Sequence, residues 1–183
     1  MSDAGAASSG PVVVLIGPPA AGKSRVGKRV ARILDLPVID TDKVIAAEHG
    51  PIPDIFTEHG EPHFRALERA AVTDALRQRA VVSLGGGAVL HPDTQAQLAG
   101  LPVVLLTATP EAVATRLEKG TRPLSASVEA WSALVARRMP VYERLAAATW
   151  ETSSRPIDRI AAEIAEWATV RETPARTTEG DRA

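Results

Sequence analysis

The segment from Gly17 to Ser24 has the residue types and spacing to hold a polyphosphate. It reads Gly-Pro-Pro-Ala-Ala-Gly-Lys-Ser and matches the pattern G-x-x-x-x-G-K-[ST], between an apolar run and a helical pattern. In this context, backbone N–H groups of the loop and of the helix start converge on phosphate oxygens. Lys23 would place a charge on the β- and γ-phosphates, and Ser24 would offer an oxygen to Mg²⁺. The motif predicts nucleotide triphosphate binding, with contacts expected from Ala20, Ala21, Gly22, Lys23, Ser24 and Arg25.

The nucleotide motif alone does not separate kinases, GTPases and ATPases. A GTPase normally reads guanine with an Asn-Lys-x-Asp segment, and this chain contains no asparagine. ATP is therefore the expected nucleotide, and the acceptor has to be inferred from other residues.

Two acidic residues, Asp40 and Asp42, follow a short apolar stretch. Ligands of open parallel sheets bind at the carboxyl ends of the strands, which would place this pair near the phosphates. If the strand continues to Asp42, both carboxylates share one face. One could then support Mg²⁺ through water, and the other could accept a proton from an acceptor hydroxyl. The alternative is structural, because Asp42 precedes Lys43 and an apolar pair and could be a helix N-cap.

Apolar runs and helical patterns alternate along the chain. We expect strands at 12–16, 37–40, 80–84 and 103–106, and helices at 26–34, 61–79, 109–120, 128–148 and 157–168. Thr109 is the expected N-cap of the third helix, with Pro110 at its first position. This alternation predicts an α/β fold with three layers, α/β/α, around a central, mostly parallel sheet.

Length and composition favour a single domain. A chain of 183 residues with 45% hydrophobic residues can build one core, expected over residues 11–170. Residues 1–10 and 171–183 offer little to bury and are expected to be disordered tails. The stretch at about 120–128 has no clear periodicity and is expected to be a short mobile lid.

Several classes of function are disfavoured by the composition. The chain has no cysteine, so it has neither disulfides nor thiolate chemistry, and its formal net charge of −1 argues against nucleic-acid binding. The apolar runs are too short for a membrane span, and the first residues do not resemble a secretory signal. We expect a cytoplasmic monomer. The four histidines show no ligand spacing and are interpreted as surface residues: His49, His59, His63 and His91.

Further along the chain, an ordered set of short segments resembles the shikimate kinase family. The set begins with the phosphate motif and Asp40-Thr41-Asp42, and it continues with Phe64-Arg65 near Glu68. The remaining members are Gly85-Gly86-Gly87, Thr121-Arg122-Pro123-Leu124, and Arg137-Arg138 followed by Pro140 and Tyr142. The likeness covers residues 12–168.

This resemblance implies a P-loop small-molecule kinase that uses ATP and Mg²⁺ to phosphorylate the 3-hydroxyl of shikimate. It implies that Ser24 and Asp40 serve Mg²⁺, and that Asp42 contacts the substrate hydroxyls and is the base. Arg65 and Arg138 would hold the substrate carboxylate, and the Gly86 backbone would help seat the ring. Arg122 would close over the phosphates from the lid, and Arg155 would lie near the adenine.

The residue types agree with an acceptor of this kind. Shikimate is a small carboxylate with hydroxyls, so its site needs guanidinium donors rather than an apolar pocket. Arg65 and Arg138 are offered by separate helices and could converge on one carboxylate, although each could also be a solvated helix arginine. Phe56 and Phe64 could be core residues or pocket walls. Three consecutive glycines make the backbone flexible, so more conformational entropy is lost when this stretch is ordered. Close approach of the backbone to a ligand would explain why glycine is present at all three positions.

The chain departs from the family at a few positions. The middle of the phosphate loop is Pro19-Ala20-Ala21, where the family often has a further glycine, and we expect little harm from this change. The rival functions are a gluconate kinase, a nucleoside monophosphate kinase, and a P-loop ATPase without a phosphoryl acceptor. The arginine and glycine set fits the first two less well, and the acidic pair argues against the third.

Overall fold

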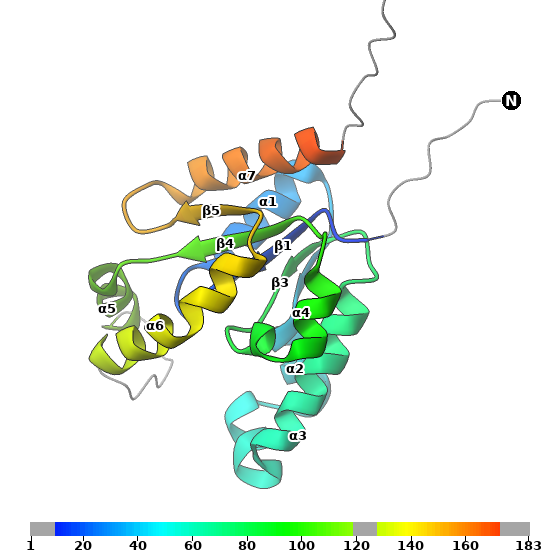
Figure 1. Cartoon of the computed structure of the whole chain (residues 1–183), viewed down its shortest axis with the longest axis vertical. Helices are drawn as coiled ribbons and strands as arrows, with labels where there is room; N and C mark the ends of the chain where they lie inside the picture. The colour runs from blue at the N-terminus through cyan, green and yellow to red at the C-terminus, as the bar shows by residue number, and fades with distance from the viewer. Residues whose placement is uncertain (1–9, 119–127, 173–183) are drawn as a thin grey trace, which may run out of the picture.

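The computed structural model describes residues 10–118 and 128–172. Figure 1 shows how the elements of this part of the chain are arranged around a central sheet. Its elements are, in order, β1 (Val13–Ile16), α1 (Lys23–Leu34), β2 (Val38–Asp40), α2 (Thr41–His49), α3 (Ile52–Ala75), β3 (Val81–Ser83), the 3₁₀ helix η1 (Ala88–Leu90), α4 (Pro92–Leu98), β4 (Val103–Thr107), α5 (Pro110–Glu118), α6 (Val128–Leu145), β5 (Ala148–Glu151) and α7 (Ile157–Glu172).

The five described strands form one parallel sheet in the order β2-β3-β1-β4-β5. Strand β1 lies at its centre, with Val14 opposite Val82 of β3 on one side and Val103 of β4 on the other. After β1 the chain forms β2 at one edge, returns to β3 beside β1, and then crosses to β4 and β5 on the other side. The strand order therefore changes direction at β1, and open α/β sheets bind ligands at the carboxyl end of such a switch point. The predicted three-layer α/β fold is confirmed.

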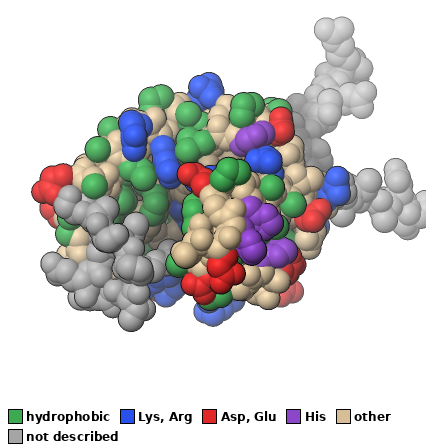
Figure 2. Space-filling view, turned by 90° about the horizontal axis from the view of Figure 1, so that it is seen from below, with side chains coloured by type: hydrophobic (Ala, Val, Ile, Leu, Met, Phe, Trp, Pro, Cys, Tyr) green, Lys and Arg blue, Asp and Glu red, His purple; other side chains and the backbone are tan. Residues whose placement is uncertain are grey.

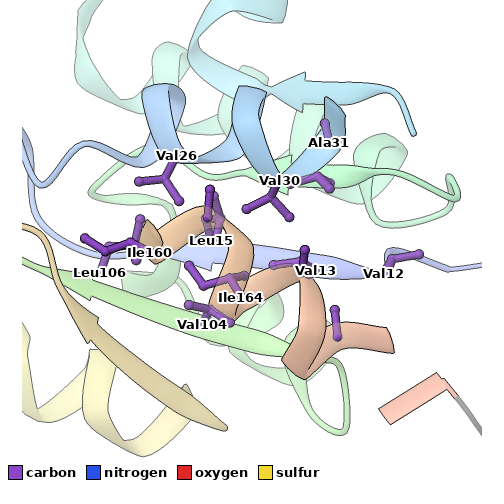
Figure 3. Packing of buried hydrophobic residues seen from close by; sticks show 14 of the residues in the cluster. Val12, Val13, Leu15, Val26, Val30, Ala31, Val104, Leu106, Ile160 and Ile164 are labelled. Atoms are coloured by element: carbon purple, nitrogen blue, oxygen red, sulfur yellow. The ribbon is translucent and has the colours of Figure 1, made fainter. Parts of the chain in front are cut away.

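Alternating residues of the central strands face two separate cores. Val13 and Leu15 of β1 pack with α1 and α7 on one face of the sheet, as Figure 3 shows. Val14 and Ile16 pack on the other face, against α3, α4 and α6. Because both faces are covered, the central strand β1 is apolar at every position, and β3 and β4 are apolar except at their last residues, as expected of a buried parallel sheet. The sheet therefore holds the loops at its carboxyl edge on a rigid base.

Several element boundaries differ from those predicted. Helix α3 begins at Ile52, well before the predicted start at 61, and it is kinked at Gly60, where φ is 79°. The predicted helix 128–148 ends at Leu145, and Ala148 begins β5, a half-exposed edge strand without an apolar run. The sequence pattern therefore carried no strand signal there. Helix α4 was not predicted, because its seven residues span too few turns to establish a period.

The end of the predicted domain, at residue 170, lies within helix α7. Helix α7 continues to Glu172, two residues beyond the predicted boundary, and Glu172 forms an ion pair with Arg79 at 2.6 Å. The predicted N-cap of α5 is confirmed, because Thr109 Oγ1 accepts a hydrogen bond from the Ala112 N–H at 3.3 Å. The predicted lid residues up to 127, and most of both predicted tails, lie outside the described residues. Among the described helices, none has the length and apolar character needed to cross a membrane.

Candidate active site

The phosphate loop leaves β1 and enters α1 through two backbone positions that require glycine. Gly22 is the N-cap of α1 and has φ 90°, in the left-handed region. Gly17 has φ 138°, and a Cβ there would lie 2.2 Å from the main-chain oxygen of Leu106. Ala20 also has a positive φ, 63°, which is unfavourable for a residue with a side chain. The Ala20 substitution that we expected to be harmless therefore lies at a strained position.

Lys23 and Ser24 are positioned by the loop and by β2. The Lys23 ammonium donates to the carbonyls of Gly17 at 2.8 Å and Pro18 at 2.9 Å, so its charge lies over the loop. The Ser24 hydroxyl donates to Asp40 Oδ2 at 2.5 Å. A hydroxyl and a carboxylate thus meet beside the phosphate-binding N–H groups, in an arrangement that suits a hard cation.

The acidic pair is arranged differently from either prediction. Strand β2 ends at Asp40, so the two carboxylates do not share a strand face. Asp40, and not Asp42, is the N-cap of α2, and its side chain accepts from the Lys43 N–H at 3.4 Å. Asp42 lies in the first turn of α2. The turn from strand to helix separates the two carboxylates, which leaves Asp40 beside Ser24 and turns Asp42 toward the glycine segment.

The three glycines after β3 each face a different wall of the site. A Cβ on Gly85 would lie 2.5 Å from Asp42 Oδ1 and 3.0 Å from Glu68 Oε1. A Cβ on Gly86 would lie 3.1 Å from Cδ of Pro19, and one on Gly87 would lie 2.6 Å from an Arg65 nitrogen. The segment is therefore the point at which the acidic turn, the phosphate loop and helix α3 meet. Close approach of other groups explains why side chains are excluded there.

Arg65 is held by two glutamates on its own helix. Its guanidinium bonds Glu68 at 2.6 Å and Glu61 at 3.2 Å. Burial lowers the pKa of Arg65, but the hydrogen bonds and charges of Glu68 and Glu61 outweigh it and raise the pKa overall. Burial raises the pKa of Glu68, and its hydrogen bond to Arg65 offsets this only in part. Arg65 is thus a fixed cation at the edge of the site.

Arg138 reaches the same place from α6. Its guanidinium donates to the Gly86 carbonyl at 3.1 Å, and the Tyr142 hydroxyl donates to the same oxygen at 2.5 Å. The charge of Arg138 also acts on Glu68, where it opposes the rise in pKa that burial causes. The structure therefore brings the predicted residues Asp42, Arg65, Gly86 and Arg138 together around the glycine segment.

The two phenylalanines lie on α3, with their ring centroids 4.6 Å apart. Phe64 is buried and packs in a small core with Ile45 and Ile55, whereas Phe56 is 37% exposed. The core interpretation holds for Phe64. At this end of the molecule, histidine and acidic side chains gather on the outer surface, as Figure 2 shows, and His49, His59 and His63 are all exposed.

Three residues that hold the phosphate loop were missed from the sequence. Arg116 of α5 donates to the Ala20 carbonyl at 2.8 Å and to the Thr152 carbonyl at 2.6 Å. Burial and then the nearby charge of Arg25 lower the pKa of Arg116. Thr152 donates to the Ala21 carbonyl at 2.8 Å, and the Trp131 indole donates to the Pro19 carbonyl at 3.0 Å. Each is an isolated residue far from the motif, so only the folded chain reveals its role.

The side chains of two predicted nucleotide contacts, Arg155 and Arg25, form no hydrogen bond with the phosphate loop among the described residues. Arg155 forms an ion pair with Glu163 of α7. Arg25 is exposed in the first turn of α1. Arg122, the predicted lid arginine, lies outside the described residues.

Taken together, the site has two ends joined at Gly86. One end offers backbone N–H groups, the Lys23 ammonium and the Ser24–Asp40 oxygen pair, which are groups that bind a polyphosphate and a hard cation. The other offers one carboxylate, Asp42, and two guanidinium groups, which suit an anionic acceptor that has a hydroxyl. Such an arrangement can carry out phosphoryl transfer between two bound molecules.

Comparisons with known proteins agree with this geometry. The profile of a family described as "Shikimate kinase" matches residues 19–169. A shikimate kinase of Corynebacterium efficiens is 40% identical over 159 residues, which cover 84% of this chain and 94% of that protein. One from Salinispora arenicola is 44% identical over 161 residues, covering 85% and 96%. The structure of shikimate kinase from Acinetobacter baumannii in complex with shikimate superposes with a TM-score of 0.80 at 27% identity, covering 90% of this chain and 95% of that one.

Proposed function

The chain belongs to the shikimate kinase family, and from this premise we propose how its residues transfer the γ-phosphate of ATP to shikimate. It is an ATP-dependent phosphotransferase that phosphorylates the 3-hydroxyl, giving shikimate 3-phosphate in aromatic amino acid biosynthesis. The two-ended site supports direct in-line transfer without a phosphoenzyme, since ATP can bind on one side of Gly86 while shikimate is bound on the other.

At the nucleotide end, the backbone of Ala20 to Arg25 binds the phosphates of ATP. Lys23 lies over the loop, where its ammonium neutralises charge on the β- and γ-phosphates during transfer. Arg155 is proposed near the adenine. Arg122 is proposed, from its motif alone, to bring a further positive charge to the transferring phosphoryl group and to help exclude water from it.

Ser24 and Asp40 are proposed to serve Mg²⁺. The 2.5 Å contact between the hydroxyl and the carboxylate provides two oxygen donors at the phosphate end, the donor type that this cation prefers. When bound, Mg²⁺ neutralises charge that develops between the β- and γ-phosphates.

At the acceptor end, Asp42 is proposed to orient the 3-hydroxyl and to take its proton. The first turn of α2 places this carboxylate against Gly85, at the boundary between the two ends. Arg65 and Arg138 are proposed to bind the substrate carboxylate, and the backbone of Gly86 to seat the ring. Because Glu61 and Glu68 already fix the Arg65 guanidinium, little side-chain entropy is lost when the substrate binds.

We also propose that the protein acts as a monomer in the cytoplasm. Asp42, Arg65, Gly86 and Arg138 converge within a single chain, so the proposed acceptor site needs no residue from a second copy. Sedimentation equilibrium across a range of protein concentrations, followed by activity measurements at the same concentrations, tests the monomer.

The convergence of Asp42, Arg65 and Arg138 on the triple glycine carries this proposal. The test is ADP formation in a coupled assay with ATP and shikimate, gluconate, a nucleoside monophosphate or no acceptor. We expect ADP formation that depends on shikimate and is at background with the others. Equal ADP formation with every acceptor, or with none, would instead indicate an ATPase. A preference for gluconate or a nucleoside monophosphate would indicate one of the rival kinases.

A further inference from the structure

Helix α6 contacts both ends of the site through one face. Near its start, the Trp131 indole N–H donates to the carbonyl of Pro19 in the phosphate loop at 3.0 Å. Further along, Arg138 and Tyr142 donate to the carbonyl of Gly86 in the glycine segment at 3.1 and 2.5 Å. The spacing i, i+7 and i+11 keeps the three side chains on one side of a helix with 3.6 residues per turn. A single rigid element therefore holds a main-chain oxygen in each of the two loops.

The two loops also contact each other directly. The Pro19 ring lies against Gly86 so closely that a Cβ on Gly86 would come within 3.1 Å of Cδ. Pro19, Gly86 and α6 therefore form a closed ring of contacts. A movement of the phosphate loop has to be transmitted either to the glycine segment or to α6.

The donors in this ring are well suited to a fixed role. Trp131 is 5% exposed and Tyr142 is fully buried, so water has little access to either hydrogen-bond donor. A tyrosine hydroxyl is protonated at neutral pH, and burial raises the pKa of Tyr142 further, so this hydroxyl remains a donor. With Arg138 and Tyr142 both bound, the Gly86 carbonyl uses both of its lone pairs. The guanidinium of Arg138 has further N–H groups for a ligand.

We propose that Trp131 and Tyr142 are positioning residues that couple nucleotide binding at the phosphate loop to acceptor binding at Gly86 and Arg138. The indole fixes Pro19, and the phenol fixes Gly86 beside the Arg138 donor. A nucleotide that orders the phosphate loop thereby orders the acceptor site through α6, and reciprocity requires the acceptor to favour nucleotide binding equally. The inference rests on the proposed function, because it takes shikimate as the acceptor.

The experiment measures the Kd of shikimate by calorimetry, with and without saturating ADP and Mg²⁺, in the wild type and in Trp131→Phe. The substitution removes the N–H and keeps an aromatic ring. In the wild type, ADP should tighten shikimate binding at least five-fold, the lower range of allosteric coupling. In Trp131→Phe the Kd without ADP should stay within two-fold of wild type, while the tightening by ADP should fall below two-fold.

Tyr142→Phe provides the second, independent variant. It removes one hydroxyl, and it should raise the Kd of shikimate three- to ten-fold without ADP, as expected for loss of one neutral hydrogen bond. Its kcat at saturating substrate should remain within two-fold of wild type. Trp167→Phe is the matched control, since Trp167 stacks edge-on to Trp150 on the opposite side of the sheet and should leave all these values unchanged.

The outcomes separate the inference from the proposed function. If the wild type neither binds nor phosphorylates shikimate, the proposed function fails. If the wild type uses shikimate but ADP does not tighten its binding, or Trp131→Phe retains the wild-type tightening, the inference is overturned. A folded Trp131→Phe protein, judged by an unchanged thermal transition, that loses the tightening supports it.

Discussion

The phosphate end and the acceptor end of the site are built in contrasting ways. The phosphate end is one continuous segment, Gly17–Ser24, whose binding groups are largely main chain and whose shape depends on positive φ angles. The acceptor end is assembled from α2, α3, the glycine segment and α6, and its binding groups are side chains held by ion pairs and hydrogen bonds.

This difference determines how each end should respond to substitution. A change in the phosphate loop disturbs backbone that is wedged against β4, so it should affect folding and nucleotide binding together. A change at the acceptor end displaces a side chain at the surface of the site, so it should affect the acceptor and leave the fold intact. The predictions below test this separation.

The largest effect is expected from Asp42→Asn. The amide cannot accept the hydroxyl proton, so kcat should fall by about 10²- to 10⁴-fold, the usual contribution of a general base. The KM for ATP should change less than three-fold, because the Asp42 carboxylate faces Gly85 of the glycine segment, whereas the phosphates are proposed to bind to the loop backbone. Steady-state kinetics on both substrates measure this. An unchanged kcat would eliminate Asp42 as the base.

Two glycine substitutions contrast the ends directly. Gly17→Ala puts a Cβ 2.2 Å from a main-chain oxygen at a φ of 138°, so it should lower the free energy of unfolding by about 3 kcal/mol or more. Gly87→Ala meets only the tip of Arg65, so it should displace that guanidinium and raise the KM for shikimate about ten-fold with little loss of stability. Urea unfolding and steady-state kinetics on both variants test this contrast. An equal loss of stability in Gly17→Ala and Gly87→Ala would contradict it.

The adjacent arginines of α6 provide a matched pair. Arg138→Ala removes a charged donor from the acceptor site and should raise the KM for shikimate about 10- to 100-fold, with a smaller effect on kcat. Arg137→Ala removes an exposed arginine and should change KM less than two-fold. A larger increase in KM for Arg137→Ala than for Arg138→Ala would show that Arg137, on a different face of α6, is the substrate arginine.

The smallest effect is expected within the phosphate loop. Ala20→Gly relieves a φ of 63° and should stabilise the protein by about 0.5–1 kcal/mol after the entropy of the more flexible unfolded chain is subtracted. Ala21→Gly is the control, because Ala21 is fully buried and has no positive φ to relieve. This substitution should therefore lower the stability of the protein. Thermal melts should show Tm rising for the first and falling for the second. A lower Tm for Ala20→Gly would show that the strain at Ala20 is negligible.

The sequence predicted the phosphate end well because its determinants are contiguous. Glycine, lysine and serine at fixed spacing, between a β-branched run and a helical pattern, identify the loop, although not the distant residues that hold it. The core strands β1, β3 and β4 were also predicted correctly, since strands buried on both faces consist almost entirely of apolar residues. By contrast, β5 is a half-exposed edge strand with Thr149 and Glu151, and it has no such run.

At the acceptor end, the sequence named the residues through family resemblance but not their geometry. The strand ends at Asp40 as predicted, but the sequence did not show that Asp40, rather than Asp42, is the N-cap of α2. The contacts of Arg116, Trp131 and Tyr142 with the phosphate loop and the glycine segment join residues 56 to 112 positions apart, and no local sequence pattern predicts them. Such contacts depend on how distant elements pack against each other, and this packing cannot be inferred from a single sequence.

The central claim is that Arg65 and Arg138, offered by separate helices, hold one acceptor carboxylate beside Asp42. A crystal structure with ADP, Mg²⁺ and shikimate tests this most directly. We predict that both guanidinium groups lie within hydrogen-bond distance of the shikimate carboxylate and that the Asp42 carboxylate lies within that distance of the 3-hydroxyl. A ligand whose carboxylate contacts neither arginine, or whose 3-hydroxyl points away from Asp42, would contradict the account.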